Sequence, residues 1–256
     1  MQYNYHTHTY HCGHASGVPE DYILRAIETG ITDMGFSDHI PFRCPDGVES
    51  NYRVQISVVE KHINELCQLR EKYKNDIRIS IGFESEYYPE QFPQMLRDVR
   101  RWGAEYLILG QHFMAPEHPN GTHTSMCGQG EDALLRYVDT VIEGMQSGAF
   151  TYVAHPDVIR YEGEFSLYQT EMRKLCVAAR NLQVPLEINF YGIRDHRHYP
   201  NSAFWEIAGE ENAPVTFGFD SHDVASAYDG ESLKTARKMV EQYHLNYIGK
   251  PKLVKI

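Results

Sequence analysis

Short apolar runs alternate along the chain with segments of helical periodicity. The clearest helical segment extends roughly from Val54 to Tyr73, where apolar side chains recur every three or four residues between charged ones. This spacing predicts an amphipathic helix with one buried face. A shorter helix is expected from Pro19, a residue suited to the first helical position, to Gly30. Further helices are predicted over residues 90–101, 131–145, 169–181, 202–210 and 232–243.

The runs between these helices have the length and composition of buried strands. Apolar runs of about four to eight residues, bounded by turn signals, are typical of such strands. Seven candidates, each followed by a helical segment, cover residues 2–6, 33–37, 77–84, 106–111, 151–155, 185–189 and 215–220. Strict alternation implies parallel strands joined by crossover helices. Since no linker or change of composition divides the chain, residues 1–256 are predicted to form a single α/β domain.

Potential metal ligands follow almost every predicted strand. His6 and His8 lie two residues apart in an extended segment, so their side chains point the same way. The later strands end in His39, Glu84, His112, His155, and Asp220 with His222. A barrel gathers strand ends from the whole chain at one mouth, whereas an open doubly wound sheet gathers only those near one switch point. We therefore predict a closed or nearly closed seven-stranded barrel, with the open sheet as the weaker alternative.

Net charge and cysteine content indicate which binding partners and which cellular compartment to expect. A net charge of −11 opposes attraction to phosphate backbones, so a long nucleic acid is not expected, although bound cations leave a small anionic substrate possible. Five cysteines without paired spacing fit a reducing compartment. No run of about 18 apolar residues indicates a membrane span, and no secretory signal is apparent. The sequence predicts a cytoplasmic protein without a membrane partner.

Buried carboxylates and imidazoles that converge on one mouth need a cation as a partner. Mixed nitrogen and oxygen ligands suit zinc, manganese or iron better than magnesium, which prefers oxygen ligands only. Metal ions about 3.5–4 Å apart can share a water molecule and lower its pKa towards neutrality. The pattern thus predicts a metal-dependent hydrolytic centre.

The motifs also resemble a known family. Residues 6–9, 13–15, 35–39, 82–84, 110–113, 154–157 and 220–223 look like the ordered motifs of the PHP (polymerase and histidinol phosphatase) superfamily. The resemblance extends from Tyr3 to about Asp223. It implies a distorted seven-stranded (β/α) barrel, similar to a TIM barrel, with three divalent metal ions (Zn, Mn or Fe).

The resemblance also implies nine metal ligands. The first ion would be held by His6, His8, Glu84 and Asp220, the second by His14, His39 and His222, and the third by Glu84, His112 and His155. A hydroxide that bridges the metals, positioned by Glu84, His6, His8 and Asp220, would be the nucleophile.

Within the superfamily, residues 84–90, 110–113 and 188–194 resemble the histidinol-phosphate phosphatase branch. That branch hydrolyses L-histidinol phosphate to L-histidinol and phosphate in histidine biosynthesis. The alternatives are a PHP phosphoesterase acting on another small phosphate, such as a nucleotide or sugar phosphate, and a non-catalytic metal-binding module. Arg160 and Arg197 are candidates for phosphate binding, because arginine matches phosphate oxygens bidentately.

Locations or roles outside the ligand set are expected for several other polar residues. Glu187 and Asn189 share a strand face and are expected to support the ligands from behind. Glu86 and Asp157 are candidates for an acidic pocket edge that receives the substrate amine. His62 is expected on the surface. The polar segment 115–130, which includes His118 and His123, is either a lid or plain surface.

Overall fold

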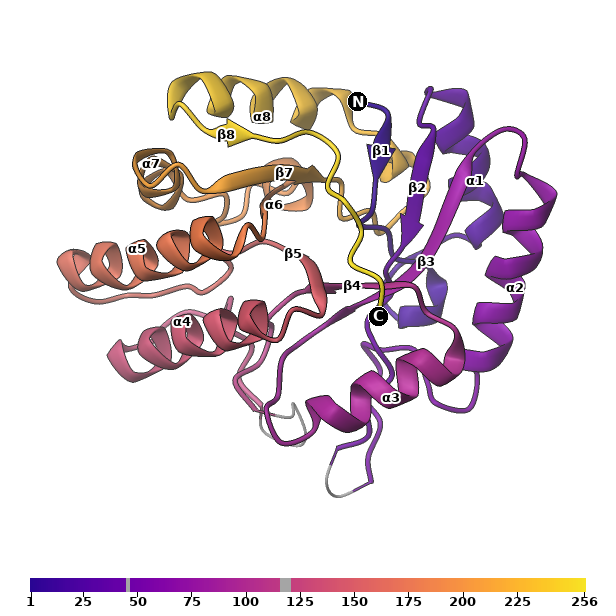
Figure 1. Ribbon diagram of the computed structural model, residues 1–256, viewed down its shortest axis with the longest axis horizontal. Coiled ribbons are helices and arrows are strands. Elements are labelled where there is room, and N and C mark those ends of the chain that lie inside the picture. The colour runs from indigo at the N-terminus through magenta and orange to yellow at the C-terminus, as the bar shows by residue number, and fades with distance from the viewer. Residues whose placement is uncertain (45–46, 116–120) are drawn as a thin grey trace.

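The protein folds as a curled parallel sheet wrapped by helices (Figure 1). A computed structural model describes residues 1–44, 47–115 and 121–256. Within these ranges the strands lie in sequence order, and each pairs in parallel with the next. They are β1 (Tyr3–Asn4), β2 (Asp33–Phe36), β3 (Arg78–Ser85), β4 (Tyr106–Leu109), β5 (Phe150–Val153), β6 (Leu186–Asn189), β7 (Pro214–Gly218) and β8 (Asn246–Tyr247). The parallel α/β prediction is confirmed.

The helices follow the strands as the periodicity predicts. They are α1 (Pro19–Glu28), α2 (Val59–Lys72), α3 (Phe92–Trp102), α4 (Glu131–Gln146), α5 (Phe165–Leu182), α7 (Ser202–Glu210) and α8 (Gly230–Gln242). The short helix α6 (Phe190–Arg194) and the 3₁₀ turns η1 (Tyr10–Cys12) and η2 (Ala225–Ala227) were not predicted, because they span too few residues to show a period. No helix in the described ranges is long and apolar enough to cross a membrane.

The curled sheet brings β1 and β7 close together. The amide of His8 donates a hydrogen bond to the carbonyl oxygen of Ser221 (2.9 Å), and the amide of Ser221 donates to that of His6 (3.2 Å). Near the opposite ends of these strands, the hydroxyls of Tyr3 and Thr216 are 3.0 Å apart. The sheet is therefore a curled, nearly closed barrel, as one form of the prediction had it, with an isolated bridge between Thr7 and Ser221 just beyond the ends of β1 and β7. β8 is an additional strand of two residues beside β7, too short to be recognised as an apolar run.

The C-terminal segment covers the amino-terminal end of the barrel. After β8 it runs across the strands towards β3 and α3 (Figure 1). The Tyr3 hydroxyl donates to the carbonyl oxygen of Gly249 (2.8 Å), and the amide of Val254 donates to Oγ1 of Thr151 (3.1 Å). Leu253 packs against an interior cluster formed by Tyr3, Tyr5, Tyr106, Ile108, Tyr152 and Ala154. Packed side chains thus fill this part of the barrel, and the opposite mouth carries the polar residues.

Candidate metal centre

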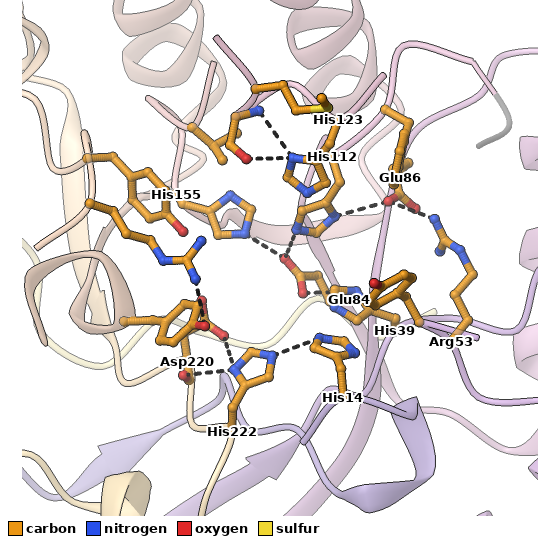
Figure 2. Close-up of a pocket in the computed structure, with 18 of the residues that line it drawn as sticks. His14, His39, Arg53, Glu84, Glu86, His112, His123, His155, Asp220 and His222 are labelled. Atoms are coloured by element: carbon orange, nitrogen blue, oxygen red, sulfur yellow. Dashed lines mark hydrogen bonds and ion pairs between the residues drawn. The ribbon is translucent and has the colours of Figure 1, made fainter. Parts of the chain in front are cut away.

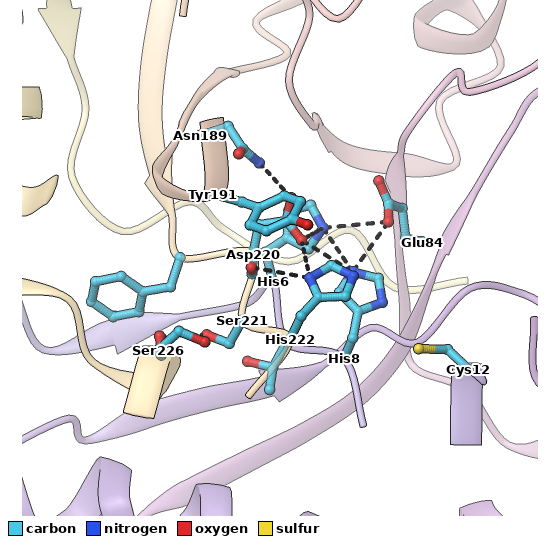
Figure 3. A network of polar contacts seen from close by, with 12 residues as sticks. His6, His8, Cys12, Glu84, Asn189, Tyr191, Asp220, Ser221, His222 and Ser226 are labelled. Carbon is cyan, nitrogen blue, oxygen red and sulfur yellow. Dashed lines mark hydrogen bonds and ion pairs between the residues drawn. The ribbon is translucent and has the colours of Figure 1, made fainter. Parts of the chain in front are cut away.

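The carboxyl ends of the strands bring the nine predicted ligands into one region. A cavity of about 460 Å³ opens there. Seven of the nine line it, and Figure 2 shows the side chain of Glu84 at its centre; these seven are His14, His39, Glu84, His112, His155, Asp220 and His222. His6 and His8 are fully buried and contact Glu84 and Asp220 (Figure 3).

His6, His8, Glu84 and Asp220 form the most compact group. Nε2 of His6 lies 3.1 Å from Nε2 of His8. Oε2 of Glu84 is 3.3 Å from each of these nitrogens, and Oδ1 of Asp220 is 3.4 Å from each. Ligands about 2.0–2.1 Å from a zinc ion at the centre of a tetrahedron would be about 3.4 Å apart. Five of the six separations among the four atoms are thus close to the spacing of ligands around a zinc ion.

Glu187 on β6 determines which nitrogen of His6 is available. Nδ1 of His6 lies 2.9 Å from Oε2 of Glu187 and donates to it, so that Nε2 of the neutral ring carries a lone pair. Nδ2 of Asn189 donates to Glu187 (2.7 Å) and to Oδ2 of Asp220 (3.0 Å), as Figure 3 shows for Asp220. A Cβ at Gly218 would lie 2.0 Å from Glu187, so this position needs glycine. The supporting role expected of Glu187 and Asn189 is confirmed by these contacts.

The charge balance of this group favours a bound cation. Burial lowers the pKa of His6, but the carboxylates of Asp220, Glu187 and Glu84 outweigh it and raise that pKa well above its usual range. Burial also raises the pKa of Glu84, but the surrounding histidines hold it well below its usual range. Glu84 is thus ionised, and positive charge beside it is strongly stabilised. A divalent ion supplies that charge while leaving the ring lone pairs free to coordinate.

A second group of imidazoles lies on the open side of the cavity. Nε2 of His222 is 3.0 Å from Nε2 of His14 (Figure 2), and the ring of His222 stacks on that of His8 with centroids 4.3 Å apart. Burial, with the nearby His8 and His222 rings, lowers the pKa of His14 to about 4. Burial likewise holds the pKa of His39 well below its usual range. These rings are neutral at pH 7, which is the state that binds metal.

The third group consists of His112 and His155, which face Oε1 of Glu84. Oε1 lies 2.9 Å from Nε2 of His155 and 3.4 Å from Nε2 of His112, while Oε2 lies 3.3 Å from Nδ1 of His39. The two oxygens therefore serve different sets of histidines, as a bridging carboxylate does. A Cβ at Gly110 would lie 2.0 Å from Oε1, so glycine makes room for this carboxylate.

Two of the predicted ligands have unusual backbone conformations. His155 has φ +30° and Asp220 has φ +47°, in the left-handed region that residues other than glycine seldom adopt. Strain of this kind persists where surrounding contacts hold it, and it is concentrated at functional sites.

The two candidate arginines occupy different places. Arg197 lines the cavity, where its guanidinium carbon lies 4.1 Å from the ring centre of Tyr191 and Nη2 donates to the Tyr191 hydroxyl (2.6 Å). The side chain of Arg160 is 45% exposed and contacts Glu162 (3.4 Å) beside a separate surface depression. The structure thus brings Arg197, but not Arg160, to the predicted ligands.

Of the two candidate acids, only Glu86 lines the cavity. Glu86 is buried between Nδ1 of His112 (3.0 Å) and Nη2 of Arg53 (2.8 Å), and although burial raises its pKa, these partners lower it to about 2. Asp157 is buried and accepts a hydrogen bond from Nε1 of Trp205 (3.1 Å). The expectation that Asp157 lies at the pocket edge is wrong, because its strand-end turn points it towards α7 instead.

Some residues of the site were missed or misplaced in the sequence interpretation. Arg53 and Tyr52 line the cavity from the segment before α2, which carries no motif. His123 and Met126 line it from segment 115–130, whereas His118 falls in 116–120, outside the described residues. His62 was expected on the surface but is buried, with Nε2 3.0 Å from Oδ2 of Asp38. Its position three residues after Val59 and four before Leu66 puts it on the apolar stripe, a signal that could have revealed it.

The fold and the site define an α/β barrel with a multinuclear metal centre at the carboxyl ends of its strands. The PHP domain model matches residues 4–190, which is most of the chain. The protein therefore belongs to the PHP domain family, as its motifs predicted.

Relatives and solved structures agree in length and fold. The chain is 25% identical over 234 residues to a probable histidinol-phosphatase from Deinococcus radiodurans, covering 85% of both chains. It is 24% identical over 260 residues to a histidinol-phosphatase from Bacillus subtilis, covering 88% of this chain and 96% of the relative. A histidinol phosphate phosphatase from Lactococcus lactis, solved with zinc, L-histidinol and phosphate, superposes with a TM-score of 0.72 at 19% identity, covering 96% of this chain and 95% of that one. The last likeness establishes the fold.

Proposed function

We propose that this protein is a metal-dependent phosphomonoesterase that hydrolyses L-histidinol phosphate to L-histidinol and phosphate. The observation that carries the proposal is the convergence of His6, His8, Glu84 and Asp220, in which both imidazoles lie within 3.4 Å of both carboxylates, beneath a cavity of small-molecule size. The names of the Deinococcus and Bacillus relatives, and the ligands in the Lactococcus structure, favour this substrate.

The ligands divide among divalent ions as the family resemblance implies. His6, His8, Glu84 and Asp220 would hold one ion, His14, His39 and His222 a second, and Glu84, His112 and His155 a third. Bound ions of this kind supply Lewis acidity, which activates water for attack on phosphorus and neutralises phosphate oxygens. Zinc, manganese and iron all suit this ligand set.

The chain's own groups orient these ligands and the substrate. Glu187 holds the proton of His6 on Nδ1, and Glu86 holds that of His112 on Nδ1, so both rings present Nε2 to Glu84. Arg197 is positioned to donate hydrogen bonds to phosphate oxygens in a bidentate contact. Its stacking on Tyr191 keeps the guanidinium in the cavity wall, where the aromatic ring also provides an apolar surface for the organic part of the substrate.

The cavity size favours a small substrate over a polymer. A cavity of about 460 Å³ is in the usual range for small-molecule sites. The cytoplasmic location and the exclusion of long nucleic acids follow from the sequence alone and stay predictions. So does the single domain over residues 1–256.

A phosphate-release assay tests the proposal. Protein reconstituted with zinc, manganese or iron should hydrolyse histidinol phosphate with a higher kcat/KM than AMP or glucose 6-phosphate. A preference for AMP or glucose 6-phosphate would favour a PHP phosphoesterase of different specificity. Lack of hydrolysis of every compound with all three metals would favour a non-catalytic metal-binding module.

A further inference from the structure

A second group of potential metal ligands lies outside the cavity, between η1 and α2. It consists of His11, His62 and Glu65, each of which offers one ligand atom within 4.8 Å of the others. His62 and Glu65 are three residues apart on α2 and so share one face of the helix. Nε2 of His11 lies 3.3 Å from Oε2 of Glu65, the same spacing that separates the ligand atoms of the main centre. None of the three is among the described residues that line the cavity.

His62 has a buried nitrogen without a partner. The residue is 1% exposed, and Nε2 lies 3.0 Å from Oδ2 of Asp38. When the ring donates its Nε2 proton to that carboxylate and carries no second proton, Nδ1 has a lone pair. In the described parts of the chain, no group donates a hydrogen bond to Nδ1. Leaving a buried polar atom unpaired costs free energy, so a ligand for this lone pair would be stabilising.

Asp38 is fixed in the orientation that this arrangement needs. Its carboxylate accepts hydrogen bonds from the amide of Thr9 (2.6 Å) and from the Thr9 hydroxyl (2.9 Å) as well as from His62. A histidine that ligates a metal usually donates its other ring proton to a carboxylate held in this way. The pair Asp38 and His62 therefore repeats the relationship between Glu187 and His6 in the main centre.

We propose that His11, His62 and Glu65 bind a further divalent transition-metal ion of the zinc type, separate from the catalytic centre. Two imidazoles and one carboxylate form a mixed nitrogen and oxygen set that leaves a fourth position for water. Solvent can deliver the ion, because the side chains of His11 and Glu65 are 9% and 36% exposed. Through Asp38 and Thr9, the ion would tie α2 to the loop that carries His8 and His14.

Metal content after reconstitution tests this site. Wild-type protein and the variants His11→Gln and Glu65→Gln are loaded with Zn²⁺, freed of excess metal and analysed for zinc per chain. Each variant should hold about one ion fewer than the wild type. His244→Gln, which alters an exposed histidine beyond α8, should hold the wild-type number. If both cluster variants retain the wild-type zinc content, the proposal is wrong.

A Glu84→Gln background separates this site from the main centre. Glu84→Gln should lose zinc from the cavity, and adding Glu65→Gln should remove about one ion more. Equal zinc content in Glu84→Gln and the double variant would contradict the proposal. Because Glu65 lies on the surface of α2, circular dichroism of Glu65→Gln should match the wild type. The readout is metal content, so the result does not depend on whether histidinol phosphate is the substrate.

Discussion

Oε2 of Glu187 lies 2.9 Å from Nδ1 of His6, although β6, the strand that carries Glu187, supplies none of the predicted ligands. The carboxylate fixes the tautomer and the ring orientation of His6 from behind. β6 thus contributes to the centre by orienting a ligand that another strand supplies. Asn189, two residues further along, extends the same support to Asp220.

Glu187→Gln should weaken metal binding without removing a ligand. The amide cannot accept the Nδ1 proton as strongly as the carboxylate does, so the affinity for the ion at His6 should fall about 10–100-fold. Chelator competition at pH 7 measures the change. Glu206→Gln, on the exposed face of α7, is the matched control and should bind metal like the wild type. Unchanged affinity in Glu187→Gln would show that the contact does not tune the ligand.

Glu84→Gln should remove most of the phosphatase activity together with bound metal. The substitution leaves the shape of the side chain but takes away the charge that two sets of histidines face. Phosphate release and zinc content are measured on the same preparation. Wild-type turnover in this variant would refute the bridging assignment. A folded variant, judged by circular dichroism, should also lose the increase in melting temperature that zinc gives the wild type.

Arg197→Ala should weaken substrate binding more than Arg160→Ala does. A hydrogen bond to a charged group contributes about 1.5–3 kcal/mol, so loss of the Arg197 contact should raise KM about 10–100-fold. Arg160 lies beside a separate depression, and its removal should leave KM close to the wild-type value. Steady-state kinetics with histidinol phosphate decide between them. A larger increase for Arg160→Ala would mean that its loop turns into the cavity when substrate binds.

Asp157 should make the wild type less stable as the pH rises from about 5 to 8. Burial raises the pKa of Asp157 to about 7, against an ordinary value of 3.8. A raised folded-state pKa means that the contribution to stability is complete below the ordinary value and is lost as the pH rises through about 7. Each pKa unit corresponds to about 1.4 kcal/mol.

Asp157→Asn keeps an acceptor for the amide of Asn201 and for Nε1 of Trp205 but does not titrate. The free energy of unfolding of this variant, relative to that of the wild type, should increase by a few kcal/mol between pH 5 and 8. Urea unfolding of metal-loaded protein at several pH values measures the difference. Two curves that stay parallel across this range would show that Asp157 is ionised in the fold throughout.

The fold was predictable because its signals are local and repeated. Apolar runs and helical periods marked the strands β1 to β7 and most helices, and a parallel barrel places every strand end at one mouth. Ligands that directly follow strands, such as Glu84 and His155, could therefore be assigned to one region from the sequence. β8 and α6 were missed, because they are too short to show a period.

Contacts between loops could not be predicted in the same way. The sequence made Arg160 and Arg197 equally good candidates for phosphate binding, but only Arg197 lies in the cavity. The direction of each loop depends on what it packs against. His62 carries the signal of a buried position, whereas its pairing with Asp38 depends on how α2 packs beside the loop after β2.

The sequence by itself determined the order of strands and helices, the convergence of the ligands and the kind of chemistry they support, because periodicity and residue type are properties of short segments. Only the tertiary structure decided which oxygen of Glu84 faces which histidine, that Glu187 orients His6, and that Asp157 turns away from the cavity. Those relationships depend on differences of a few tenths of an ångström in the distances between side chains that are far apart in the chain. Packing of the whole barrel sets these distances.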